Sequence, residues 1–275
     1  MNINDIRHKQ YMHDDTRMLR SVEINPTELC NRTCTFCPRH APKTYPNRSK
    51  HIQLKTLKNI CKGLLEMDYT GRVGFVGFGE PLLHVDIYSC VNTVRDMLPG
   101  LKWLEINTNG DKLTRDVLCK LYESGCSHVT VSMYDHDRSI ELDNMSQDIP
   151  LHMTYRHHYD MSNSYNLNLV NRHEMLTDNK TTYNNQPCYI PFYKMMIDWN
   201  GDVMLCNNDW NRTKTFGNVN NKDLYNIWFG QQMNSHRKQL LRGRSRCVPC
   251  KNCSVDGQQR GVECVNIYHE RFENS

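Results

Sequence analysis

Segments with the periodicity of strands alternate with segments of helical periodicity between residues 21 and 156, and this alternation limits the possible folds most. The segment 51–68 repeats apolar side chains near helical spacing, which is typical of an amphipathic helix. Strands are predicted within 21–30, 72–84, 102–110, 127–135 and 149–156, and further helices at 85–98 and 113–125. Strands joined by helices form βαβ units, so the sequence predicts an α/β fold built on a parallel sheet.

Unusual loops follow four of the predicted strands. They carry cysteines, glycines or polar side chains, and they span residues 30–37, 77–81, 107–110 and 132–135. The carboxyl ends of parallel strands meet at one edge of the sheet, where active sites of such folds lie. The four loops are therefore predicted to form one shared site.

Composition excludes several classes of protein. The 275 residues include 34 Lys and Arg against 30 Asp and Glu, and the two signs are interspersed. We therefore expect no nucleic-acid partner. The longest basic cluster, 237–246, is predicted to be a solvated helix face, with contact to a phosphate-bearing substrate as the alternative. The polar start and the lack of a run of about 18 apolar residues predict a soluble, cytoplasmic protein without a membrane partner.

Thirteen cysteines in a chain expected to be cytoplasmic favour metal or cluster ligands over disulfides. Three of them, Cys30, Cys34 and Cys37, share the loop after the first predicted strand. A closed zinc or iron–sulfur site usually takes four protein ligands, so three thiolates on a [4Fe–4S] cube leave one iron open. The alternative is a zinc knuckle with a remote fourth ligand such as His40.

The spacing C-x3-C-x2-C, with Phe36 before the last cysteine, resembles that of the radical S-adenosylmethionine (SAM) superfamily. The resemblance implies a partial (β/α)6 TIM-like barrel over residues 21–185, after a lead-in at 1–20. It implies that SAM binds the open iron of a [4Fe–4S] cluster. One electron, from a flavodoxin- or ferredoxin-type donor, then cleaves SAM to a 5′-deoxyadenosyl radical that abstracts hydrogen from the substrate.

Other loops fit the same family and supply candidate SAM-binding residues. The turn GFGEP (77–81) resembles the family's GGEP motif, in which Gly77, Gly79 and Glu80 would lie against the SAM amino group. Local turn bonding is the alternative for Asn107, and a solvated side chain is the alternative for Arg156. The resemblance assigns cofactor binding to Phe36, Gly77, Gly79, Glu80, Asn107, Ser132 and Arg156.

A second set of cysteines follows a polar stretch at 161–186. Between Cys188 and Cys206, the pair Asn200-Gly201 joins two apolar runs and predicts a β-hairpin. With FGNV and LYNIW, this part resembles the SPASM/Twitch extension of radical SAM proteins, placed at 186–265 with a tail at 266–275. That resemblance implies one auxiliary [4Fe–4S] cluster. Cys247 is the alternative ligand in place of Cys250 or Cys253. The ligands assigned to the cluster are Cys188, Cys206, Cys250 and Cys253.

Four thiolates leave no open iron, so the auxiliary cluster is expected to accept an electron. We therefore expect a radical SAM oxidoreductase that completes a two-electron oxidation of a small-molecule substrate. The alternatives are an enzyme that modifies a ribosomally made precursor peptide, and a non-catalytic iron–sulfur or zinc redox sensor. The sequence does not single out a general base. The candidates are His152, Tyr155, Arg156, His157 and Glu80.

Overall fold

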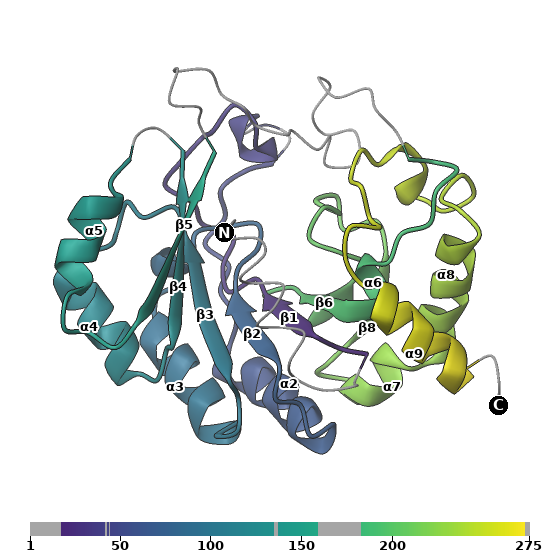
Figure 1. Cartoon of the computed structure of the whole chain (residues 1–275), viewed down its shortest axis with the longest axis horizontal. Coiled ribbons are helices and arrows are strands. Elements are labelled where there is room, and N and C mark those ends of the chain that lie inside the picture. Colours follow the sequence, from purple (N-terminus) through teal and green to yellow (C-terminus); the bar gives the residue numbers. More distant parts are fainter. Residues whose placement is uncertain (1–17, 42, 44, 135–136, 159–182, 273–275) are drawn as a thin grey trace.

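In the computed structural model, residues 18–41, 43, 45–134, 137–158 and 183–272 are described. One eight-stranded sheet runs through them in the order β5-β4-β3-β2-β1-β6-β7-β8. It is open, and it curves from β5 at one end to β8 at the other, with helices α2 to α5 beside the parallel strands (Figure 1). Across the described ranges, no helix is both long and apolar enough to cross a membrane.

The first five strands are parallel and alternate with helices, which confirms the predicted α/β class. The strands are β1 (Ser21–Ile24), β2 (Arg72–Phe75), β3 (Trp103–Thr108), β4 (His128–Met133) and β5 (His152–His157). The helices are α2 (Leu54–Glu66), α3 (Ile87–Met97), α4 (Arg115–Glu123) and α5 (Ser139–Ser146). Short 3-10 turns, η1 (Pro38–His40) and η2 (Pro81–Leu83), follow the cysteine loop and the GFGEP turn. A candidate sixth strand near 167–170 falls outside the described residues.

Local sequence explains where these helices begin and end. The Asp86 carboxylate accepts from the amide of Ser89 at 3.3 Å and caps α3, and the Thr114 hydroxyl caps α4 in the same way. Gly125 follows α4 with φ of +95°, a left-handed conformation that favours glycine. The apolar stripe of α2 is buried against the sheet, as its periodicity predicts.

The predicted hairpin is present, and it extends the barrel sheet. Strands β6 (Lys194–Ile197) and β7 (Asp202–Met204) pair antiparallel around Gly201, whose φ is +93°. Strand β6 also pairs parallel with β1, so hairpin and barrel share one sheet. Strand β8 (Thr215–Asn218), which the sequence analysis did not predict, adds to β7. Five elements complete this part of the chain: α6 (Ile190–Tyr193), α7 (Leu224–Trp228), α8 (Gln231–Leu241), η3 (Cys250–Asn252) and α9 (Val262–Phe272).

The expectation that the basic cluster 237–246 is a solvated face is wrong for two of its arginines. Arg237 and Arg244 are only 0% and 1% exposed. Arg237 donates to the carbonyl oxygens of Pro191 at 2.9 Å and Trp228 at 2.7 Å, and its guanidinium lies 4.2 Å from the Trp228 ring centroid. Hydrogen bonds to the buried carbonyl groups of neighbouring segments therefore hold these side chains in the interior.

Candidate functional site

A cavity of about 200 Å³ lies at the carboxyl ends of β1 to β5. It brings together the three cysteines of the first loop and every SAM-binding residue expected from the sequence, although these come from five separate loops and strand ends. The predicted residues that line it are Cys30, Cys34, Cys37, Phe36, Gly77, Gly79, Glu80, Asn107, Ser132 and Arg156.

The cysteine loop is held by polar side chains outside the motif. The Asn47 side chain both accepts from the amide of Cys30, at 2.9 Å, and donates to its carbonyl oxygen, at 2.8 Å. Arg39 donates to Asn47 Oδ1 at 3.1 Å and to the carbonyl oxygen of Phe78 at 2.5 Å. Arg32 forms an ion pair with Asp111, which follows β3. The loop is thus fastened to the ends of β2 and β3.

The GFGEP turn packs directly against the chain that leads into this loop. The amide of Glu80 donates to the carbonyl oxygen of Leu29 at 2.7 Å. A Cβ on Gly79 would lie 2.2 Å from the carbonyl oxygen of Thr27 and 2.7 Å from that of Leu29, closer than atoms can approach. Glycine at position 79 therefore permits backbone-to-backbone packing just before Cys30.

Glu80 is buried within this site, and its carboxylate joins the turn to the end of β3. It accepts from the Thr108 hydroxyl at 2.7 Å and from the amides of Asn109 at 2.8 Å and Leu82 at 3.1 Å. Burial raises the pKa of Glu80 against the lowering effect of these donors. One oxygen receives a single protein donor, which leaves acceptor capacity toward the cavity.

The candidate bases separate into two groups. Arg156 and Glu80 line the cavity. Tyr155 donates to Asp143 Oδ1 at 2.5 Å, and the His152 ring packs against His128 with centroids 5.0 Å apart. Neither these two side chains nor His157 lines this cavity or the two described below.

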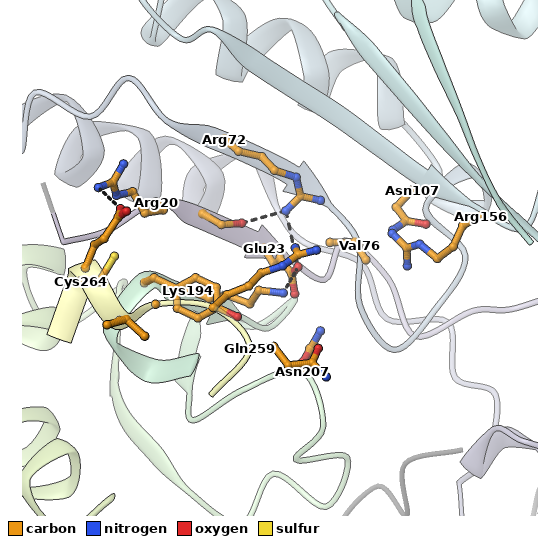
Figure 2. Close-up of a pocket in the computed structure, with 16 residues that line it drawn as sticks. Arg20, Glu23, Arg72, Val76, Asn107, Arg156, Lys194, Asn207, Gln259 and Cys264 are labelled. Carbon is orange, nitrogen blue, oxygen red and sulfur yellow. Dashed lines mark hydrogen bonds and ion pairs between the residues drawn. The ribbon is translucent and has the colours of Figure 1, made fainter. Parts of the chain in front are cut away.

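A larger cavity of about 430 Å³ adjoins the first (Figure 2). The two share four wall residues, Val76, Asn107, Arg156 and Asn207. The larger cavity extends along the sheet to Ser21, the first residue of β1. Residues 259–264 of the C-terminal part bound it. Its volume is within the range of small-molecule sites, roughly 300–1,000 Å³.

Ion pairs lie along the wall of this larger cavity. Lys194 donates to Glu23 at 2.7 Å, and Arg72 donates to the buried Glu105, also at 2.7 Å. Arg20 pairs with Glu263 at 3.7 Å. Burial tends to raise the pKa of Glu23, but Lys194 and Arg72 outweigh burial and hold that pKa below its ordinary value. Glu23 is therefore an ionised carboxylate at neutral pH.

The four cysteines assigned to an auxiliary cluster surround a small cavity of about 20 Å³ in the C-terminal part. Cys247 is not among its lining residues, and its thiol lies 3.9 Å from both Gln239 Oε1 and the carbonyl oxygen of Gly243. Gly257 makes room for one ligand, because a Cβ there would lie 2.4 Å from the Cys188 sulfur. The assigned cysteines that line the cavity are Cys188, Cys206, Cys250 and Cys253.

A segment of the C-terminal part reaches the first cavity directly. Asn207 and Trp210 line it, and they follow Cys206 in sequence. Arg212 anchors this segment, since it pairs with Glu28 and, at 2.5 Å, with Asp198. The Trp210 ring packs against Tyr45 and Phe78 with centroids 4.9 and 4.8 Å apart. One segment thus contributes to both cysteine-lined cavities.

Three of the cavity residues that were not predicted from the sequence share one feature. Arg39 and Trp210 line the first cavity, and Arg244 lines the auxiliary one. Each is buried and has one N–H group without a partner among the described residues: Nη2, Nε1 and Nε, respectively. The one available signal was proximity to a cysteine, because Arg39 follows Cys37 by two positions. Buried donors of this kind normally meet an acceptor, so both cavities fit a group that offers acceptors.

The donor sets also fit iron–sulfur clusters. Soft thiolates select such clusters, and three on one loop plus four around a second cavity match an open and a closed cube. The remaining cysteines differ in setting: burial raises the pKa of Cys61, Cys90 and Cys126 to about 12, as expected for small core residues. Cys264 lies on the wall of the larger cavity.

Comparison with protein families agrees with both sites. The family described as the radical SAM superfamily matches residues 24–148, and the family described as SPASM, an iron–sulfur cluster-binding domain, matches residues 188–254. A GTP 3′,8-cyclase of Synechococcus elongatus is 27% identical over 121 residues, 44% of this chain and 36% of the cyclase. That similarity therefore covers only part of both proteins.

A SAM-dependent 2-deoxy-scyllo-inosamine dehydrogenase of Niallia circulans is similar over nearly its whole length. It is 28% identical over 244 residues, which are 86% of this chain and 94% of that protein. The crystal structure of BtrN in complex with AdoMet and 2-DOIA superposes with a TM-score of 0.76 at 25% identity, over 90% of this chain and 97% of the other. The structure of anSMEcpe with bound AdoMet shares the fold, with a TM-score of 0.57 at 15% identity over 92% and 96%. This chain therefore carries a domain of the radical SAM superfamily at residues 24–148 and a C-terminal SPASM iron–sulfur domain at residues 188–254.

Proposed function

We propose that this protein is a radical SAM dehydrogenase that oxidises a small metabolite by two electrons. The observation that carries this proposal is the arrangement of its three cavities. The cavity with three cysteines shares wall residues, Asn207 among them, with the small-molecule-sized cavity, and the neighbours of Asn207, Cys206 and Asn208, line the pocket with four cysteines. The similarity to a SAM-dependent dehydrogenase over most of both chains supports the same reaction class.

We assign the SAM-binding cluster to Cys30, Cys34 and Cys37, and the auxiliary cluster to the four cysteines of the second pocket. When bound, SAM and the two clusters supply a hydrogen-abstracting radical and an acceptor for the substrate's second electron. The chain itself orients and encloses these groups. Asn47 and Arg39 fix the loop of three cysteines, and Glu80 holds the neighbouring turn at the SAM cavity.

The substrate is placed in the cavity of about 430 Å³, between residues of the barrel and residues 259–264. A one-electron donor of the flavodoxin or ferredoxin type is the proposed redox partner. The solved complex of SuiB with its precursor peptide shares only the fold, at 14% identity and a TM-score of 0.53. It gives no support for a peptide substrate here.

The direct test is reductive cleavage of SAM. The protein is reconstituted anaerobically with iron and sulfide, reduced with dithionite and supplied with SAM, and 5′-deoxyadenosine is measured by chromatography. We expect product from the natural sequence and none from the variant with Cys30, Cys34 and Cys37 all replaced by alanine. An absence of product from fully cluster-loaded natural protein contradicts the enzymatic function.

Iron counting tests the assignment of the two clusters. Two [4Fe–4S] cubes give about eight irons per chain. The triple alanine variant at the first loop should retain about half, and so should a Cys250→Ala/Cys253→Ala variant. Unchanged iron in either variant shows that its cysteines are not the ligands. A Cys247→Ala variant, as the control, should keep the full amount.

A further inference from the structure

We propose that the substrate of this cavity carries a negatively charged oxyanion group, a carboxylate or a phosphate. This inference rests on the proposed function, because it concerns the substrate of the same site. It separates this protein from the relative named for an inosamine, an amino compound that is cationic at neutral pH. The charges along the cavity wall support this proposal.

The wall holds five cationic side chains, and three of them are neutralised by carboxylates. Lys194 pairs with Glu23, Arg72 with Glu105, and Arg20 with Glu263. The other two cations have no ion pair or hydrogen bond from their side chains to any residue in the described ranges. They are Arg156 and Arg260.

Two uncompensated guanidinium groups favour an anion in this cavity. A concave wall that carries one excess sign of charge concentrates ions of the opposite sign. Guanidinium groups also match the geometry of carboxylates and phosphates, because they donate two parallel hydrogen bonds. An ammonium-bearing ligand would instead be repelled by the same two side chains.

The buried carboxylate of the wall lies away from Arg156. Glu23 is 5% exposed, and its Oε1 atom accepts from Lys194. Figure 2 shows Glu23 between Arg72 and Lys194, whereas Arg156 lies beside Asn107 at the end of the cavity away from Arg20. An anionic group of a ligand can therefore meet Arg156 away from the Glu23 carboxylate.

Arg156 and Arg260 differ in which cavity they line. Arg156 lines both the SAM cavity and the substrate cavity, whereas Arg260 lines only the latter. Arg260 is half-buried and lies just before α9, in the segment that bounds the substrate cavity. It is therefore the side chain whose replacement reports on the substrate anion without the SAM carboxylate.

The test measures anion binding to the cluster-loaded, SAM-saturated protein by anaerobic calorimetry. Inorganic phosphate and acetate are the probes, and they distinguish a phosphoryl from a carboxylate group. The tighter-binding anion should lose at least tenfold in affinity in Arg260→Met and recover most of it in Arg260→Lys. Arg242→Met, an exposed arginine outside all three cavities, should leave the affinity unchanged.

A second comparison uses larger probes of opposite charge, myo-inositol 1-phosphate and 2-deoxy-scyllo-inosamine. The phosphate ester should bind at least tenfold more tightly than the amine. Saturable binding of neither anion, binding that survives Arg260→Met, or tighter binding of the amine overturns the inference. Cleavage of SAM to 5′-deoxyadenosine is measured on the same samples, so a failure of the proposed enzymatic function is seen separately.

Discussion

Both cysteine-lined cavities have buried side chains with an N–H group that lacks a partner among the described residues. Leaving such a donor unsatisfied costs roughly 1–3 kcal/mol, so we expect the groups bound in these cavities to supply acceptors. Arg39 Nη2 and Trp210 Nε1 lie at the first cavity, and Arg244 Nε lies at the second. SAM oxygens and cluster sulfurs are the acceptors that the proposed function supplies there.

Trp210→Phe tests whether the Trp210 N–H group donates to SAM in the first cavity. The variant keeps the ring packing on Tyr45 and Phe78 but removes the N–H group. Loss of one hydrogen bond of about 1–1.5 kcal/mol should weaken SAM binding by roughly tenfold in anaerobic equilibrium dialysis. Trp228→Phe is the matched control, because Trp228 Nε1 is also buried and unpartnered among the described residues but lies outside all three cavities. Equal effects of the two variants would show that Trp210 acts only through packing.

Arg244 places a buried positive charge beside the auxiliary cysteines, where it donates to the carbonyl oxygens of Val255 at 2.5 Å and Pro187 at 3.0 Å. Arg244→Met should lower the reduction potential of the auxiliary cluster, because the added electron loses a compensating cation. A unit charge about 6 Å away at an effective dielectric constant of about 20 corresponds to a shift on the order of 100 mV. Redox titration followed by electron paramagnetic resonance measures it. Arg244→Lys should retain most of the natural potential, and a shift as large as in the Met variant would exclude the charge effect.

At the scale of elements, the GFGEP turn and the cysteine loop behave as one unit. Gly79→Ala would push a Cβ into the backbone carbonyls of Thr27 and Leu29, which cannot rotate away. We expect a loss of about 2–3 kcal/mol in the free energy of unfolding, together with weaker SAM binding, since the shift reaches Cys30.

Gly100→Ala is the control for this prediction. A Cβ at Gly100 meets only Thr70 Cγ2, at an ordinary 3.8 Å. Thermal unfolding and SAM dialysis of both variants separate the two positions. If Gly79→Ala unfolds and binds SAM like the Gly100 variant, the close packing of the turn is not needed for the site.

At the scale of the whole molecule, Glu23 links the barrel strands to the hairpin through Lys194 of β6 and Arg72 of β2. Its pKa is lowered in the folded protein, so its stabilisation is present above the ordinary value of 4.5 and is lost as the pH falls through the folded value. Glu23→Gln should cost about 2–3 kcal/mol at pH 7, less than the roughly 3–5 kcal/mol of a fully buried pair, because Arg72 keeps Glu105.

The expected result is a stability difference between natural protein and Glu23→Gln that is constant near neutral pH and shrinks below about pH 4.5. Denaturant titrations of the cluster-loaded protein between pH 7 and pH 4 measure it. Asp116→Asn is the control, since Asp116 pairs with Lys120 at the surface of α4. A difference for Glu23→Gln that does not change with pH would show that its charge is not the source of stability.

Much of the fold was readable from local patterns. Periodicity predicted strands β1 to β5 and helices α2 to α4 in order, but not α5, and the cysteine spacing with GFGEP predicted residues that line the first cavity. The hydrogen-bond and ion-pair partners of those residues could not be predicted from local sequence patterns. Asn47 and Asp111 are ordinary polar residues, and they matter because folding brings them to Cys30 and Arg32.

By itself, the sequence determined the α/β class and the resemblance to the radical SAM and SPASM families, and it predicted two sets of cluster ligands, because these depend on periodicity and on the spacing of cysteines along the chain. Only the tertiary structure decided that β6 joins β1, that Arg237 and Arg244 are buried, and that two cations of the larger cavity have no ion pair among the described residues. These features depend on pairing between distant segments and on which charges meet. The physical reason is that burial and charge balance are properties of the assembled sheet and its cavities, to which sequence neighbours contribute little.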